Sequence, residues 1–182
     1  MQLCLRENHK SKRLSITENQ RGEPALFLAP FVATPTPVVR QMLILAELQP
    51  GELLYDLGSG DGRAVIMAAK DFGAKSVGVE LRDDLTKRAL DSIEKLNLAE
   101  KTEILQRDIF DVDLSSANVV FLYLTTSANE RIKPKLESEL KPGTRVVSHD
   151  YEILGWKPSK VDNFCENPVI GYPSHTLYVY KV

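Results

Sequence analysis

Apolar residues occur along the chain in two alternating patterns, and their order predicts an α/β fold. Short, nearly continuous apolar runs predict buried strands at 53–57, 76–80, 103–106, 118–124 and 144–148. The segments between them carry apolar residues at helical spacing, which predicts helices over 62–72, 85–96 and 132–140. Strands that alternate with amphipathic helices are typical of a parallel sheet with helices on both faces.

The C-terminal part of the chain breaks this alternation. Strand patterns at 160–165 and 175–181 are separated by the turn signals Asn167-Pro168 and Tyr172-Pro173, with no helix between them. Two neighbouring strands joined without a crossover must run antiparallel. We therefore expect five parallel strands followed by an antiparallel hairpin.

Two local features concern the ends of helices. Thr34 or Thr36 can cap a helix that carries an apolar stripe over 38–46. Pro134 falls within the segment 132–140, where it either bends the predicted helix or marks its first turn.

The length of 182 residues allows one well-cored domain and is too short for two of typical size. Residues 1–24 are polar and weakly periodic, so they can be disordered, form a short hairpin or lie across the domain. The proline-rich segment that follows predicts an extended, docked stretch of chain. We expect an N-terminal arm over 1–29 and one domain over 30–182.

Charge and cysteine content narrow the possible partners and location. With 23 basic and 25 acidic side chains, the chain has no net positive field, so stable binding of nucleic acid is not favoured. Cys4 and Cys165 lie far apart, which indicates neither a zinc site nor a disulfide framework and fits a reducing cytosol. No segment has the length of a signal peptide or a membrane span. We expect a soluble, cytoplasmic protein without a membrane span.

Three glycines at the junction between the first strand and its helix form the most informative motif. Gly58, Gly60 and Gly62 follow the pattern G-x-G-x-G, and Asp56 stands two residues before the first of them. A dinucleotide-binding loop reads G-x-G-x-x-G, with the third glycine one position later. An ordinary glycine-rich turn is the alternative.

Glu80 lies twenty residues after Gly60, at the predicted carboxyl end of the second strand. A carboxylate there can accept hydrogen bonds from both hydroxyls of a ribose. Dehydrogenases also carry an acid at this place, so Glu80 indicates an adenosine-bearing cofactor without deciding which one. A solvated acid at a strand end is the alternative.

The glycine loop with its preceding acid resembles the cofactor loop of class I methyltransferases that use S-adenosylmethionine. A longer resemblance, over about residues 30 to 181, is to the archaeal broad-specificity protein-lysine methyltransferases and their mitochondrial relatives. The segments that carry it are 31–35, 38–43, 55–63, 78–80, 129–140 and, above all, Lys141 to Asp150. It implies a Rossmann-like seven-stranded sheet, mostly parallel with a C-terminal antiparallel hairpin, and S-adenosylmethionine as the cofactor.

The resemblance also implies roles for particular residues. It assigns the acid Asp108 to the adenine amino group and Ile109 to packing against the adenine ring. The residues expected to bind the cofactor are Thr34, Asp56, Gly58, Gly60, Glu80, Asp108 and Ile109. For Asp108, a helix cap or a turn is the alternative role.

The chain departs from the family pattern at several places. The family usually reads Y-V-P-T-P before the first helix, whereas Phe31 and Ala33 replace the tyrosine and the first proline here. Asp150 stands where glutamate is common. The fourth strand ends in Tyr123-Leu124-Thr125-Thr126, without the [DN]-P-P-[YF] motif of enzymes that methylate bases, so base methylation is disfavoured.

Methyl transfer to lysine needs a neutral amine, which at a pKa of about 10.4 is roughly one lysine in 2,500 at pH 7. A narrow, partly apolar channel lowers that pKa, so no strong base and no metal are required. Candidates for the channel are Phe31, Tyr123, His149, Tyr151 and Trp156. Among them His149 and Tyr123 are the catalytic candidates, with a structural role as the alternative for His149 and packing for Trp156.

The sequence therefore predicts an enzyme, monomeric or weakly associating, that transfers methyl groups from S-adenosylmethionine to lysines of protein substrates. One alternative keeps the cofactor but gives it a small-molecule or RNA acceptor. Another is a cofactor-binding module without catalysis.

Overall fold

The protein is described by a computed structural model over residues 31–167, 169 and 171–182. The expected arm over 1–29 therefore lies outside the described residues, as does the expected start of the domain at residue 30. In the described ranges no helix is both long and apolar enough to cross a bilayer.

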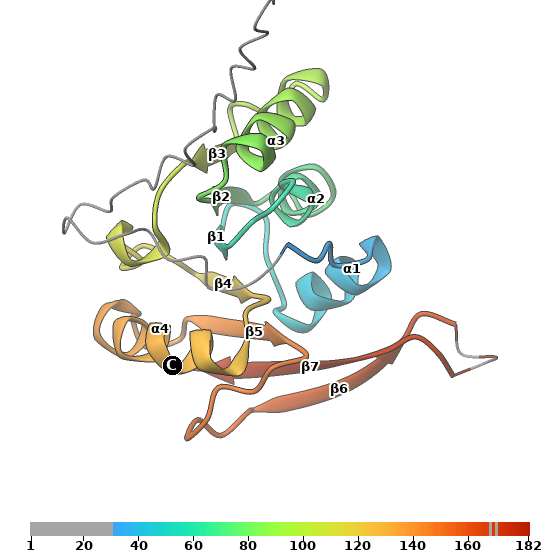
Figure 1. Cartoon of the computed structure of the whole chain (residues 1–182), viewed down its shortest axis with the longest axis vertical. Helices are drawn as coiled ribbons and strands as arrows, with labels where there is room; N and C mark the ends of the chain where they lie inside the picture. The colour runs from blue at the N-terminus through green and yellow to red at the C-terminus, as the bar shows by residue number, and fades with distance from the viewer. Residues whose placement is uncertain (1–30, 168, 170) are drawn as a thin grey trace, which may run out of the picture.

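Strands and helices alternate as predicted (Figure 1). The strands are β1 (Leu53–Leu57), β2 (Lys75–Val79), β3 (Thr102–Leu105), β4 (Val119–Leu122), β5 (Arg145–His149), β6 (Lys160–Cys165) and β7 (Ser174–Lys181). The helices are α1 (Thr36–Leu45), α2 (Arg63–Phe72), α3 (Asp83–Lys95) and α4 (Thr126–Glu139), with a 3-10 turn η1 (Ile109–Asp111). The predicted bounds of β1 and β6 are confirmed.

The seven strands form one sheet in the order β3-β2-β1-β4-β5-β7-β6. Strands β1 to β5 run parallel, whereas β7 is antiparallel to both β5 and β6. The expected mostly parallel sheet with a C-terminal antiparallel hairpin is confirmed. Strand β7 lies inside the sheet because its Leu177, Val179 and Tyr180 are buried, whereas β6 has no fully buried residue and forms the edge.

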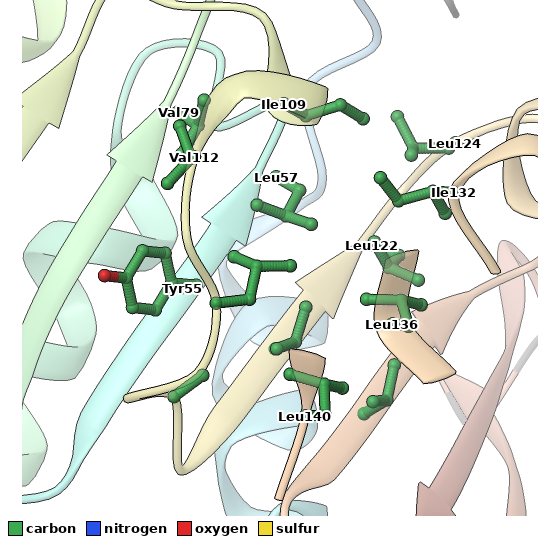
Figure 2. Packing of buried hydrophobic residues seen from close by; sticks show 14 of the residues in the cluster. Tyr55, Leu57, Val79, Ile109, Val112, Leu122, Leu124, Ile132, Leu136 and Leu140 are labelled. Atoms are coloured by element: carbon green, nitrogen blue, oxygen red, sulfur yellow. The ribbon is translucent and has the colours of Figure 1, made fainter. Parts of the chain in front are cut away.

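Each face of the sheet carries its own hydrophobic core. Because side chains alternate along a strand, Leu54 of β1 packs with α1 and α2, whereas Tyr55 and Leu57 pack on the opposite face. Figure 2 shows this second core, in which Ile132 and Leu136 of α4 lie over the strands. Helices thus cover both faces, as the α/β class requires.

The expected cap of α1 is wrong, and one of the two alternatives for Pro134 is excluded. The residue that caps α1 is Pro35, and neither threonine makes a side-chain capping bond, because Thr36 is already the first helical residue. Pro134 does not mark a first turn either. Helix α4 begins eight residues earlier, after Thr125 caps it by accepting a hydrogen bond from the Ala128 N–H, and Pro134 lies in its interior.

The parallel strands end along one edge of the sheet, and the chain segments that follow them meet there. The segment 58–62 follows β1, Glu80 follows β2 and Tyr123 follows β4. In open α/β sheets, ligands bind outside these carboxyl ends, near the point where the strand order reverses. Here that point lies between β1 and β4.

Candidate active site

A pocket opens at this edge of the sheet. It is lined by all seven residues expected to bind the cofactor, namely Thr34, Asp56, Gly58, Gly60, Glu80, Asp108 and Ile109. Tyr123 also lines it, whereas His149 does not. Residues separated by more than seventy positions in the sequence therefore share one cavity, as the motif spacing predicts.

The glycine loop is held in a conformation that favours glycine. Gly60 has a φ of +56°, and a Cβ at this position would collide with the ring of Phe31. The loop is tied to the end of β2, because the N–H groups of Gly58 and Ser59 both donate to the carbonyl oxygen of Val79, at 2.8 and 3.0 Å. The loop therefore presents backbone, rather than side chains, to the pocket.

Glu80 braces two loops from a buried position. Its Oε2 accepts a hydrogen bond from the Gly60 N–H and its Oε1 accepts one from the Arg82 N–H, both at 2.9 Å. The residue is only 9% exposed, so it is not a solvated acid. Each carboxylate oxygen has a second lone pair, which leaves acceptors for two hydroxyl groups in the pocket.

Asp56 places a carboxyl group with a raised pKa in the wall of the pocket. Burial, together with the nearby charges of Glu80 and Asp61, raises the pKa of its carboxyl to about 7, so the group is about half ionised at pH 7. In the described part of the chain, its carboxylate accepts no hydrogen bond and pairs with no cation. An acid in this state fits a cationic ligand, and S-adenosylmethionine carries both an ammonium and a sulfonium group.

Asp108 and Ile109 lie at the end of the pocket beyond β3. Asp108 is the N-terminal cap of η1, since its Oδ1 accepts a hydrogen bond from the Phe110 N–H at 3.1 Å. The alternative of a capping aspartate is therefore realised. The same bond fixes the carboxylate at the pocket wall, beside the buried side chain of Ile109.

Tyr123 and His149 form a stacked pair beside the pocket, with ring centroids 3.9 Å apart and an interplanar angle of 30°. Tyr123 reaches the pocket, whereas His149 is fully buried behind it at the end of β5. Burial lowers the pKa of His149 well below its usual value, so the imidazole is neutral at pH 7. Burial and the charge of Asp150 raise the pKa of Tyr123.

The other channel candidates lie in different places. Phe31 lines the pocket, and the ring of Tyr151 is 6.3 Å from that of Tyr123. Trp156 does not line the pocket: its Nε1–H donates to Glu137 at 2.8 Å, and its ring packs edge-on against Tyr180. For Trp156 the packing role is therefore correct.

Sequence reasoning missed one residue that shapes the pocket. Arg63 pairs with both carboxylate oxygens of Asp61, at 2.7 and 2.9 Å, and donates to the carbonyl oxygen of Thr34 at 2.7 Å. This holds the segment before α1 against the glycine loop. The acid–glycine–arginine sequence directly after Gly60 was the available signal.

Comparison with known proteins agrees with this geometry. Residues 56–160 match the model of the ANTKMT methyltransferase domain family. A protein-lysine N-methyltransferase of Saccharolobus islandicus is 48% identical over 84% of this chain and 93% of that protein. The mouse adenine nucleotide translocase lysine N-methyltransferase is 30% identical over 85% of this chain and 67% of that protein.

A solved structure is similar over nearly the same region. It is an RNA methyltransferase of Salinibacter ruber in complex with S-adenosyl-L-homocysteine, 42% identical, with a TM-score of 0.77 over 83% of this chain and 94% of that chain. The chain therefore belongs to the ANTKMT methyltransferase family and is an S-adenosylmethionine-dependent enzyme of the protein-lysine methyltransferases.

Proposed function

We propose that this enzyme methylates lysine side chains of protein substrates in the pocket at the carboxyl ends of β1, β2 and β4. The carboxyl group of Asp56, which has no partner among the described residues, supports the cofactor part of this proposal, because it fits the ammonium group of S-adenosylmethionine. The 48% identity to a protein-lysine N-methyltransferase supports lysine as the acceptor. When bound, the cofactor supplies the methyl group as an electrophile on a sulfonium. The protein's own residues have to bind, orient and shield the reactants.

We assign the cofactor-binding roles along the wall of the pocket. Asp56 and the backbone of the loop from Gly58 to Gly60 hold the amino-acid end. Glu80 accepts hydrogen bonds from the ribose hydroxyls through the lone pairs that its two backbone donors leave free. Asp108 accepts a hydrogen bond from the adenine amino group, and Ile109 packs against the ring.

Tyr123 is the residue best placed to meet the substrate amine. It lines the pocket, and its hydroxyl can accept a hydrogen bond from the amine and so point the nitrogen lone pair toward the cofactor loop. His149 acts through Tyr123 as a positioning residue, because it stacks against the phenol ring and has no surface in the pocket. The apolar neighbours Phe31 and Leu124 favour the neutral form of a bound amine.

RNA is a second candidate acceptor, because a structure 42% identical to this chain is named as an RNA methyltransferase. Two observations favour protein. The chain carries a formal net charge of −2, which gives no general attraction for a phosphate backbone. The segment that follows β4 also lacks the [DN]-P-P-[YF] motif. We further propose that the enzyme is a monomer and that it is cytoplasmic, since a content of only two cysteines fits a reducing compartment.

One assay separates these acceptors. The enzyme is incubated with cofactor labelled on its methyl group, together with either a protein extract freed of RNA or purified RNA, and the marks are located by mass spectrometry. We expect label on lysines and none on RNA. The variant Tyr123→Phe should lower kcat about tenfold or more with little change in cofactor binding, since one hydrogen bond to the amine is lost.

The exposed tyrosine variant Tyr172→Phe is the matched control and should leave the rate unchanged, because Tyr172 is 71% exposed. Label that appears only on RNA would overturn the assignment of the acceptor. Equal rates for the parent and Tyr123→Phe would remove Tyr123 from the mechanism.

A further inference from the structure

Beside the pocket, three side chains from β5, its following turn and β7 bring their ligand atoms together. They are His149, Asp150 and His175. We propose that these residues form a binding site for one divalent transition-metal ion. The site lies where β5 ends and β7 begins. The prediction of no zinc site came from the spacing of the two cysteines, which does not show that these three residues meet.

The distances between the three ligand atoms carry this proposal. Nε2 of His149 lies 2.9 Å from Nδ1 of His175 and 3.2 Å from Oδ2 of Asp150, and the third side of the triangle is 3.7 Å. A triangle of these sides has a circumscribed radius of about 1.9 Å. A point just off its plane therefore lies about 2.0–2.1 Å from all three atoms, which is the bond length of Zn²⁺ to imidazole nitrogen and carboxylate oxygen.

The outer nitrogens of both imidazoles have oxygen partners, as is usual for metal-ligating histidines. Oε1 of Glu166 lies 3.1 Å from Nε2 of His175. As a carboxylate it accepts the proton of Nε2, so Nδ1 of neutral His175 presents a lone pair to the centre of the triangle. Oγ1 of Thr34 lies 3.4 Å from Nδ1 of His149 and can either donate or accept.

The carboxylate is held in place by the backbone around it. Asp150 has a φ of +60°, a left-handed conformation that is uncommon outside glycine. Its N–H donates to the carbonyl oxygen of Thr176 at 2.7 Å, and its Oδ1 accepts from the Thr176 N–H at 2.9 Å. Oδ1 of Asp150 therefore bonds to the backbone, whereas its Oδ2 faces the two imidazoles.

The ligand types select the class of metal. Two imidazole nitrogens and one carboxylate oxygen suit Zn²⁺, Co²⁺, Ni²⁺ or Cu²⁺ and suit Mg²⁺ and Ca²⁺ poorly, because the latter prefer oxygen ligands throughout. Three protein ligands leave one position of a tetrahedron open for water. The site also adjoins the pocket, because Tyr123 stacks on His149.

Titration with Co²⁺, followed by its visible absorption, tests the site directly. The chain over residues 1–182 is used without a histidine tag, with Cys4→Ser, His9→Ala and Cys165→Ser to remove other sulfur and imidazole ligands. We expect one equivalent of Co²⁺ to bind and Zn²⁺ to displace it. The variants His175→Ala and Asp150→Asn should each weaken binding about 100-fold or more, and Glu166→Gln about 10-fold to 100-fold.

Two further measurements keep the outcome decisive if a variant folds poorly. Zn²⁺ should raise the Tm of the parent and leave that of folded His175→Ala unchanged, because a ligand stabilises only the state that binds it. X-ray absorption of the Co²⁺ complex should show two imidazole ligands. The absence of saturable binding, or Co²⁺ affinity unchanged in both His175→Ala and Asp150→Asn, would overturn the proposal.

Discussion

The variant Asp56→Asn is expected to bind S-adenosylmethionine about 100-fold more weakly than the parent, and to be more stable than the parent when no cofactor is present above pH 7. Both effects have one cause. Above pH 7 most Asp56 side chains are ionised beside Glu80 and Asp61, and in the described part of the chain that charge has no partner until the cofactor's ammonium group arrives. A 100-fold loss corresponds to about 2.7 kcal/mol, which is reasonable for a charge pair in a partly buried site.

The sign of the stability effect follows from the raised pKa. The folded-state pKa of Asp56, about 7, lies above the ordinary aspartate pKa of 3.8, so between these two values the folded protein retains a proton that the unfolded chain has lost. The free energy of unfolding of the parent therefore falls as the pH rises through this window and stays low above it. Asparagine has no such charge, so the variant avoids this loss.

Two measurements test this prediction. Calorimetric titration with the cofactor gives the Kd, and thermal unfolding without cofactor at about pH 8 should show a Tm higher by about 2 °C or more in the variant. Asp83→Asn is the matched control, because the side chain of Asp83 is 61% exposed and pairs with Lys87 at the surface. Equal cofactor affinity in Asp56→Asn and the parent would exclude Asp56 from the site.

The variant Glu80→Gln is expected to lose nearly all cofactor binding and part of the order of the glycine loop. Each carboxylate oxygen of Glu80 accepts a backbone N–H, from Gly60 on one side and Arg82 on the other. Glutamine keeps only one oxygen, so its amide NH₂ must face one of these donors. A buried donor is then left without an acceptor, at a cost of about 1–3 kcal/mol, in addition to the ribose hydrogen bonds.

We expect the Kd for S-adenosylhomocysteine to rise about 100-fold or more in Glu80→Gln, and hydrogen exchange to become faster in the loop over 58–62. Glu103→Gln is the matched control, since Glu103 is an exposed glutamate on the neighbouring strand β3. Unchanged exchange in the loop together with unchanged affinity would contradict the role of Glu80 as a brace.

The features predicted well from sequence are those that depend on local pattern. The bounds of β1 and β6 follow directly from their runs of strand-forming residues. The acid and glycines from Asp56 to Gly60, with Glu80 twenty residues later, lie in one pocket because a strand, a helix and a second strand bring the two segments together.

The features that sequence could not predict depend on tertiary contacts. Pro134 lies inside α4 because the buried residues Ile132 and Leu136 hold the helix around it, despite its poor helix propensity. His175 meets His149 only because β7 inserts between β5 and β6. Strand β7, rather than β6, lies next to β5 because β7 has the more buried side chains. The turn signals predict a hairpin but do not show which of its two strands pairs with β5.

We propose that the pocket beside the glycine loop holds the cofactor, with Asp56, Glu80 and Asp108 along its wall. The most direct measurement is an experimental structure of the full chain in complex with S-adenosyl-L-homocysteine. We expect the ammonium group within hydrogen-bond reach of Asp56, the ribose hydroxyls on Glu80 and the adenine amino group at Asp108. A ligand bound elsewhere, or bound here with its ribose away from Glu80, would contradict this proposal.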